Sequence, residues 1–171
     1  MSRPTRVLTP SADVLYRIKR GLAGYVSYLA ACEMNEAFSE YILYEPTLRI
    51  LTARGFTVHC EYPCPGFKKN GPGDYKKIDF VAHGNGEHFA IEMKWARKRN
   101  INVSSDVEKL KRFSKANINT KAKAFLCIFG RKSHVHEIIV TPSGLKEQGA
   151  AVFAEFGVTK FGCRTYKIEN S

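Results

Sequence analysis

The first part of the chain carries apolar residues at helical spacing. From about residue 11 to residue 43 the pattern predicts helix, with Ser11 as a candidate cap. A second helix is expected to begin at Glu45-Pro46, where Pro takes its favoured first-turn position, and to end at Gly55. The apolar positions of the first helix are Val14, Leu15, Ile18, Leu22, Val26 and Leu29.

Alternating apolar and polar positions then predict three strands. Phe56–Tyr62 is the first, and the three Gly and three Pro of residues 63–74 indicate a loop after it. Two further runs, Lys76–Ala82 and Glu87–Trp95, flank the tetrapeptide His83-Gly84-Asn85-Gly86. Asn-Gly between two such runs strongly indicates a hairpin, because a type I′ turn needs positive φ at both central residues.

The second half of the chain adds a helix and a buried strand. Ser105-Asp106-Val107-Glu108 is typical of a capping box, and Val107, Leu110 and Phe113 form the apolar side of the helix that it would open. The apolar run Ala122–Phe129 is expected to be a buried parallel strand, reached by a helical crossover. Further strands are predicted at His136–Val140 and Cys163–Ile168, in an otherwise irregular tail. The order of elements predicts an α/β fold.

Length, charge and cysteine content narrow the class of protein. A chain of 171 residues fits one domain, with a helical part at about 1–44, a core at about 45–130 and an extension at about 131–171. The net charge of +11 predicts a polyanionic partner such as nucleic acid, although a basic protein without that role is the alternative. Five irregularly spaced cysteines favour a reducing, cytoplasmic location over a disulfide framework. Cys60 and Cys64 lack the second ligand pair that a zinc site would need.

The predicted hairpin places chemistry on one face of the sheet. If Asn85 and Gly86 are the turn residues, Asp79 faces Glu92 across the ladder, and alternation puts Lys94 on the face of Glu92. Opposed carboxylates repel unless a positive charge lies between them, and Mg²⁺ is a hard cation that one or two carboxylates bind. Such an ion would hold a scissile phosphate and activate water, with Lys94 orienting or deprotonating that water. The alternative interpretation is a solvated salt-bridge ladder.

The segments Lys77-Ile78-Asp79-Phe80 and Ile91-Glu92-Met93-Lys94 resemble the signature of the PD-(D/E)XK nuclease superfamily. The resemblance implies a restriction-endonuclease-like αβββαβ core with a mixed central sheet, from about Glu45 to Gly130. It implies a nuclease dependent on Mg²⁺ or Mn²⁺, in which Asp79, Glu92 and the backbone carbonyl of Met93 bind metal and Lys94 is catalytic. Ile78 stands where the family has Pro, a replacement that removes no ligand.

A fourth acid is expected from the helix before the first strand. Family members often carry a Glu there, and Glu45 stands at that place, with Glu40 as its competitor. Helix capping is the alternative role for Glu45, because an acid is favoured at the positive end of the helix dipole. Asp74 is the alternative first acid, although it lies in the predicted loop.

Basic residues flank the predicted site and are candidates for binding phosphates. They are Lys68, Lys69, Lys76, Lys77, Arg97, Lys98, Arg99, Lys109 and Arg112, with Lys109, Arg112 and Lys115 forming a stripe on the helix. His134 and His136, on one face of a predicted strand, are either metal ligands or a polar edge cluster.

Together these features predict a metal-dependent nuclease, with DNA favoured over RNA as substrate and endonuclease over exonuclease action. Cutting both strands would require a second active site, which indicates a homodimer. The alternatives are a binding module that keeps the fold without catalysis and a partner protein whose basic faces contact another chain.

Overall fold

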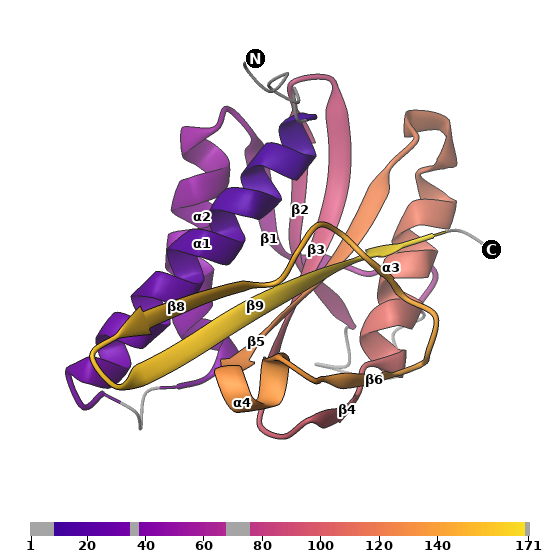
Figure 1. The fold of residues 1–171 in the computed structure, drawn as a ribbon. Helices are drawn as coiled ribbons and strands as arrows, with labels where there is room; N and C mark the ends of the chain where they lie inside the picture. Colours follow the sequence, from indigo (N-terminus) through magenta and orange to yellow (C-terminus); the bar gives the residue numbers. More distant parts are fainter. Residues whose placement is uncertain (1–8, 35–37, 68–75, 170–171) are drawn as a thin grey trace, which may run out of the picture.

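A computed structural model describes residues 9–34, 38–67 and 76–169 (Figure 1). α1 runs from Pro10 to Ala31. Its N-cap is Thr9 and not the expected Ser11: the Oγ1 of Thr9 accepts a hydrogen bond from the backbone N–H of Ala12. The predicted helix to residue 43 is therefore too long: α1 ends at Ala31, and a separate 3-10 turn, η2 (Glu40–Leu43), leads directly into α2 (Tyr44–Ala53).

A mixed sheet forms the centre of the molecule, as predicted. Its strand order is β1-β2-β3-β5-β9-β7, and β8 also pairs with β9. Among the described strands of this sheet, β3 and β5 form the one parallel pair, and the connection between them passes through α3. The strands and helix are β1 (Thr57–Pro63), β2 (Lys77–Gly84), β3 (Glu87–Ala96), α3 (Ser104–Ala116), β5 (Lys123–Arg131), β7 (Lys146–Glu147), β8 (Val152–Phe156) and β9 (Thr159–Ile168).

The β2–β3 hairpin has the predicted register. Phe80 pairs with Ile91 and Gly84 pairs with Glu87, so the turn residues are Asn85 and Gly86. Both have positive φ, +51° and +75°, as a type I′ turn requires. The prediction from the Asn-Gly dipeptide is thus confirmed.

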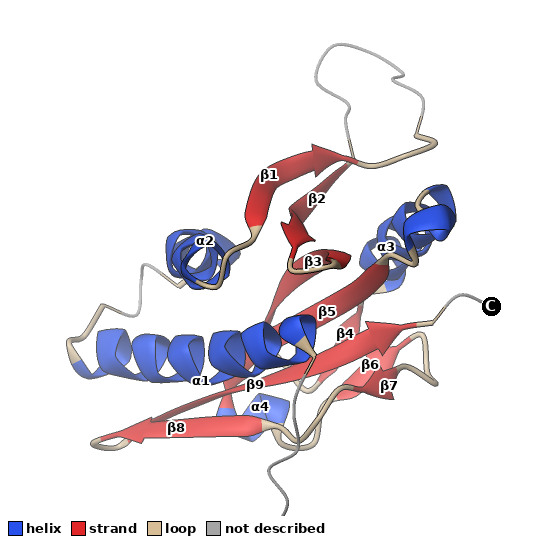
Figure 2. Ribbon diagram, turned by 90° about the horizontal axis from the view of Figure 1, so that it is seen from above, coloured by secondary structure: helices blue, strands red, loops and turns tan. Residues whose placement is uncertain are grey.

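Helices cover both faces of the sheet (Figures 1 and 2). α1 and α2 pack on one face, where α1 buries Val14, Leu15, Ile18, Leu22 and Val26 against sheet residues such as Phe89, Ile91 and Phe125. α3 packs on the other face, where its buried Val107, Leu110 and Phe113 meet Val81, Ala90 and Leu126. Alternation along β3 therefore places Glu92 and Lys94 on the side of α3.

Several local expectations were wrong. α3 begins at Ser104 with Val103 as cap and no side-chain capping bond, so the predicted capping box does not form. His134 lies in a short helix, α4 (Lys132–Val135), rather than on a strand, and strand β6 covers only Ile139–Thr141. β6 pairs with β4 (Asn100–Asn102) in a separate two-stranded sheet. The tail is more regular than expected, since β8 and β9 form a hairpin.

All five cysteines are free thiols. Among the described helices, none combines the length and the apolar character needed to cross a bilayer.

Candidate active site

Asp79 is held firmly on β2. Its Oδ1 accepts a hydrogen bond from the hydroxyl of Tyr44, at the start of α2, and its Oδ2 accepts one from the backbone N–H of Met93 at 2.7 Å. Burial raises the pKa of the Asp79 carboxyl, although both hydrogen bonds act to lower it. Both carboxylate oxygens are thus oriented from two different elements.

Glu92 is the most deeply buried acid of the site, with 2% of the residue exposed. Burial and the neighbouring charge of Asp79 raise the pKa of its carboxyl to about 9. The Nζ of Lys109 lies 2.7 Å from Glu92 Oε1, but among the described residues this oxygen has no partner with hydrogen-bond geometry. Lys109 lowers the pKa of Glu92 by its charge and by hydrogen bonding and so opposes the effect of burial, and a carboxylate oxygen keeps a second lone pair for another ligand.

A chain of alternating charges links Glu92 to η2. Lys109 Nζ lies 3.4 Å from Asp106 Oδ1, and Lys94 Nζ lies 3.5 Å from Asp106 Oδ2. Lys94 Nζ also lies 3.7 Å from Glu40 Oε1, which accepts a 3.1 Å hydrogen bond from the backbone N–H of Trp95. These contacts join Glu92 and Lys94 in one polar cluster, and Asp79 lies beside it, hydrogen-bonded to the N–H of Met93 and close enough for its charge to raise the pKa of Glu92.

Glu45 does not reach this cluster. Its side chain is 66% exposed and pairs with Arg49, one turn further along α2. The acid that approaches from the N-terminal side is Glu40, because the 3-10 turn η2 lies against β3 and the first turn of α2 directs Glu45 outward. The geometry therefore favours Glu40, the alternative candidate for the fourth acid.

Asp79 and Glu92 suit a hard divalent cation. The described residues include no group of three or more His, Cys, Asp or Glu side chains arranged to hold a metal. A site of two carboxylates matches Mg²⁺ or Mn²⁺, which keep several waters, better than Zn²⁺. The supporting observation is the buried Glu92 carboxyl, which lies beside Asp79, an acid whose charge raises the pKa of Glu92. A metal-ligand role for the Met93 carbonyl stays a prediction.

Two of the predicted phosphate contacts flank the site. Arg97 and Lys98 line a groove of about 640 Å³ together with Lys94 and Glu40. Lys109, expected on an outward stripe, instead contacts Glu92 with only 13% of its side chain exposed.

The remaining residues predicted to contact phosphates either contact other residues of the protein or lie outside the described residues. Lys76 and Arg112 stack over the ring of Phe67, and Lys77 pairs with Glu61 at 2.7 Å. Arg99 turns away to Glu137, at 3.0 Å. Lys68, Lys69 and the alternative acid Asp74 lie outside the described residues.

The structure gives no support to His134 and His136 as metal ligands. His134 lies on α4 with its Nδ1 3.2 Å from the carbonyl oxygen of Ala96, and His136 follows the helix.

Sequence reasoning missed Tyr44 and Asp106 as members of the site. Asp106 carried a signal, an acid in the first turn of the helix that follows the catalytic strand; nothing in the sequence marked Tyr44.

Comparison with known proteins assigns the family. No curated protein and no solved structure was found to match this chain. A model of the family described as "Archaeal holliday junction resolvase (hjc)" matches residues 48–157, which is more than half of the chain and includes Asp79, Glu92, Lys94 and Lys109. The match agrees with the mixed α/β fold and with the superfamily signature. The chain therefore belongs to the archaeal Holliday junction resolvase family, a family of DNA nucleases within the PD-(D/E)XK superfamily.

Proposed function

We propose that this protein is a divalent-metal-dependent endonuclease that cuts four-way DNA junctions. The observation that carries the proposal is the placement of the buried Glu92 beside the partly buried Asp79, whose charge raises the pKa of the Glu92 carboxyl and whose Oδ2 accepts a hydrogen bond from the N–H of Met93, the next residue after Glu92. Two ionisable acids close together are unfavourable without a compensating positive charge; Lys109 supplies one without metal, and the two carboxylates offer the oxygen ligands that a divalent cation prefers. The four-way junction as substrate comes from the matched family.

Asp79 and Glu92 would hold Mg²⁺ or Mn²⁺. When bound there, the ion supplies the Lewis acid that stabilises phosphate charge and lowers the pKa of water. Tyr44 and the Met93 N–H orient the Asp79 carboxylate. Glu40 and Asp106 hold the Lys94 ammonium at the edge of the site, where it can orient an attacking water or neutralise charge that develops on the phosphate.

The groove beside Lys94 is suited to the backbone of the cut strand. Arg97 and Lys98 line it together with Lys94, so they can bind phosphates next to the scissile one. Resolving a junction takes two cuts, and the part of the chain that the structure describes contains one such site; the active unit would therefore be a homodimer. Sedimentation equilibrium across a range of protein concentrations measures that oligomeric state directly.

A cleavage assay tests the proposed function. A four-way junction, a linear duplex of the same sequence and a single strand are incubated with the protein in Mg²⁺, Mn²⁺ or EDTA. We expect cuts in the junction with either metal and none in EDTA. Asp79→Asn and Lys94→Met should lower the cleavage rate by at least about 100-fold while leaving junction binding in place. Metal-independent cleavage, or unchanged rates in both variants, would contradict the assignment.

A further inference from the structure

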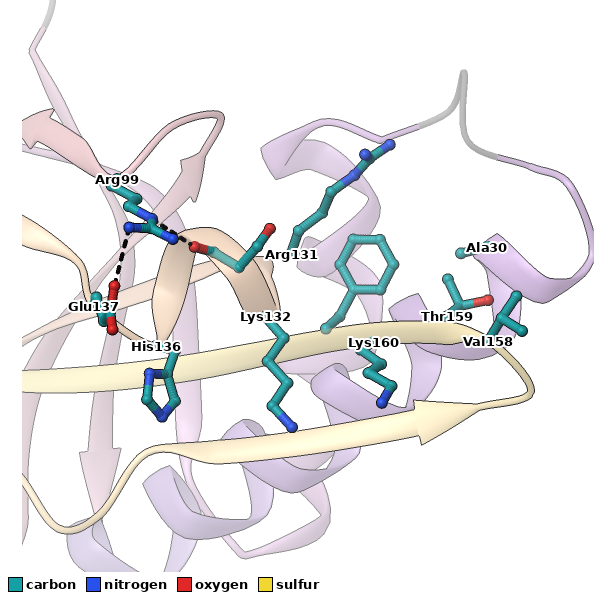
Figure 3. A pocket seen from close by; sticks show the side chains of 11 residues that line it. Ala30, Arg99, Arg131, Lys132, His136, Glu137, Val158, Thr159 and Lys160 are labelled. Carbon is teal, nitrogen blue, oxygen red and sulfur yellow. Dashed lines mark hydrogen bonds and ion pairs between the residues drawn. The ribbon is translucent and has the colours of Figure 1, made fainter.

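A second groove lies on the far side of the turn that follows β3. It has a volume of about 790 Å³ and is walled by the end of β5, by α4 and by the start of β9, with Ala30 of α1 at one end (Figure 3). Most of its polar lining is basic: Arg99, Arg131, Lys132 and Lys160, joined by His136. It is separate from the groove that contains Lys94 and Glu40, since the two share no lining residue.

Acidic residues only partly balance this charge. Glu155 on β8 contacts both Lys132, at 3.2 Å, and Lys160, at 3.4 Å, so one carboxylate is shared by two ammonium groups. Arg99 pairs with Glu137 at 3.0 Å. Arg131 makes no ion pair with any residue in the described ranges, and it is exposed. Four cations against two acids leave a net positive groove.

The turn between β3 and β4 connects the two grooves. Arg97 and Lys98 line the groove beside the catalytic cluster, and the next residue, Arg99, lines the second one. Basic side chains therefore continue from Lys94 across this turn to Arg131 and Lys160. Such a path matches a phosphodiester backbone, which presents a negative charge at each nucleotide step.

We infer that the groove formed by Arg99, Arg131, Lys132 and Lys160 binds the phosphate backbone of a second duplex arm, away from the scissile phosphate. This inference rests on the proposed function, because only a branched substrate brings a second arm to the same protomer. The family match ends at residue 157, so Lys160 and the start of β9 lie beyond it. Exposed basic side chains that have no buried polar side chain beside them contact the phosphate backbone of DNA and do not read its bases. The groove would therefore increase the affinity for branched DNA.

A pair of double variants tests the inference. Arg131→Ser with Lys160→Ser removes two charges from the groove and leaves Lys132 to pair with Glu155. The matched control, Lys146→Ser with Lys167→Ser, removes two charges from β7 and β9 near the far end of the sheet, where both lysines contact Glu169. Binding of an immobile four-way junction and of a duplex the length of one arm is measured in EDTA, over a range of salt concentrations.

The groove variant should bind the junction about tenfold more weakly than the control variant at low salt. Its plot of log affinity against log salt should be less steep by about 1.8, since each lost phosphate contact removes about 0.9 from the slope. Affinity for the single-arm duplex should stay equal in the two variants. Equal junction affinity and equal slope in the two variants would overturn the inference. Failure of the wild-type protein to cut junctions in metal would instead overturn the proposed function, and that result comes from a separate assay.

Discussion

Lys109 Nζ lies 2.7 Å from Glu92 Oε1, so an ammonium from α3 is the nearest positive charge to the most buried carboxylate on β3. Burial alone would lower the pKa of the Lys109 ammonium, yet the charge of Glu92 reverses this and raises it. In the absence of metal, Lys109 thus supplies next to Glu92 the positive charge that a divalent cation would provide.

Replacing Lys109 should tighten metal binding. Without metal its ammonium contacts the Glu92 carboxyl, and with metal it would be repelled by the ion; Lys109→Met therefore destabilises the first state and favours the second. We expect Mn²⁺ affinity to rise by about tenfold, measured by titration calorimetry, while metal-free stability falls. Lys109→Arg should keep wild-type affinity, and Lys111→Met, at an exposed position on the same helix, serves as control. A weaker Mn²⁺ affinity in Lys109→Met would contradict this role.

Glu40, rather than Glu45, should matter for cleavage. Glu40 holds the Lys94 ammonium and accepts a hydrogen bond from Trp95, whereas Glu45 pairs with Arg49 in solvent. Glu40→Gln should slow junction cleavage by about tenfold, because partners of catalytic groups commonly matter at that scale. Glu45→Gln should change the rate by less than about twofold, as expected for an exposed pair. Single-turnover rates in Mg²⁺ decide between them, and the reverse ranking would restore Glu45 as the fourth acid.

Tyr44 should act on metal affinity through Asp79. Tyr44→Phe removes the hydroxyl that donates to Asp79 Oδ1 and leaves the ring, which packs on Phe80 with centroids 4.8 Å apart. Mn²⁺ affinity should fall by about tenfold with little change in the midpoint of thermal unfolding. Tyr41→Phe, on an exposed neighbouring ring, is the matched control. Equal Mn²⁺ affinity in the two variants would show that the hydroxyl has no positioning role.

Metal-free stability should fall as the pH rises. The ordinary pKa of Glu92 is 4.5 and the folded value is about 9, so the fold favours the neutral carboxyl. This contribution is fully present below pH 4.5 and is lost as the pH rises through about 9; the raised pKa of Asp79 acts in the same direction. Urea unfolding between pH 5.5 and 8.5 measures the trend.

Glu92→Gln cannot ionise and should show a flatter dependence of unfolding free energy on pH. In the wild-type protein, Mn²⁺ binding at pH 7 should release a proton, which calorimetry detects in buffers of different ionisation enthalpy. Parallel pH profiles for the wild-type protein and Glu92→Gln would show that the Glu92 carboxyl is ionised throughout this range.

The parts of the fold that short-range chemistry controls were predictable. The register of β2 and β3 follows from one dipeptide, since Asn85 and Gly86 tolerate positive φ, and the predicted pairing is observed from Gly84–Glu87 to Phe80–Ile91, next to Asp79 and Glu92. The buried apolar run of β5 indicated a parallel neighbour, which proved to be β3. These features needed no knowledge of distant contacts.

Features that depend on packing between elements were not predictable. Glu40 reaches Lys94 only because a 3-10 turn replaces the end of the expected helix, and the pattern of apolar residues did not show that break. Lys109 had the spacing of a solvated stripe, but α3 packs with this residue turned toward β3. The β8–β9 hairpin was missed because its first strand is short and its exposed residues do not alternate clearly.

The residues matched by the family model are fewer than the residues that pack together in the folded domain. The family match begins at residue 48 and ends at 157, whereas α1 precedes it and all of β9 follows it. α1 covers much of one face of the sheet with Val14, Leu15, Ile18, Leu22 and Val26, all fully or almost fully buried. A shortened protein cut to the matched residues would expose that apolar face to water and lose Glu40 and Tyr44 as well. The unit that folds, and that should be expressed for any experiment, is thus longer than the unit that sequence comparison detects.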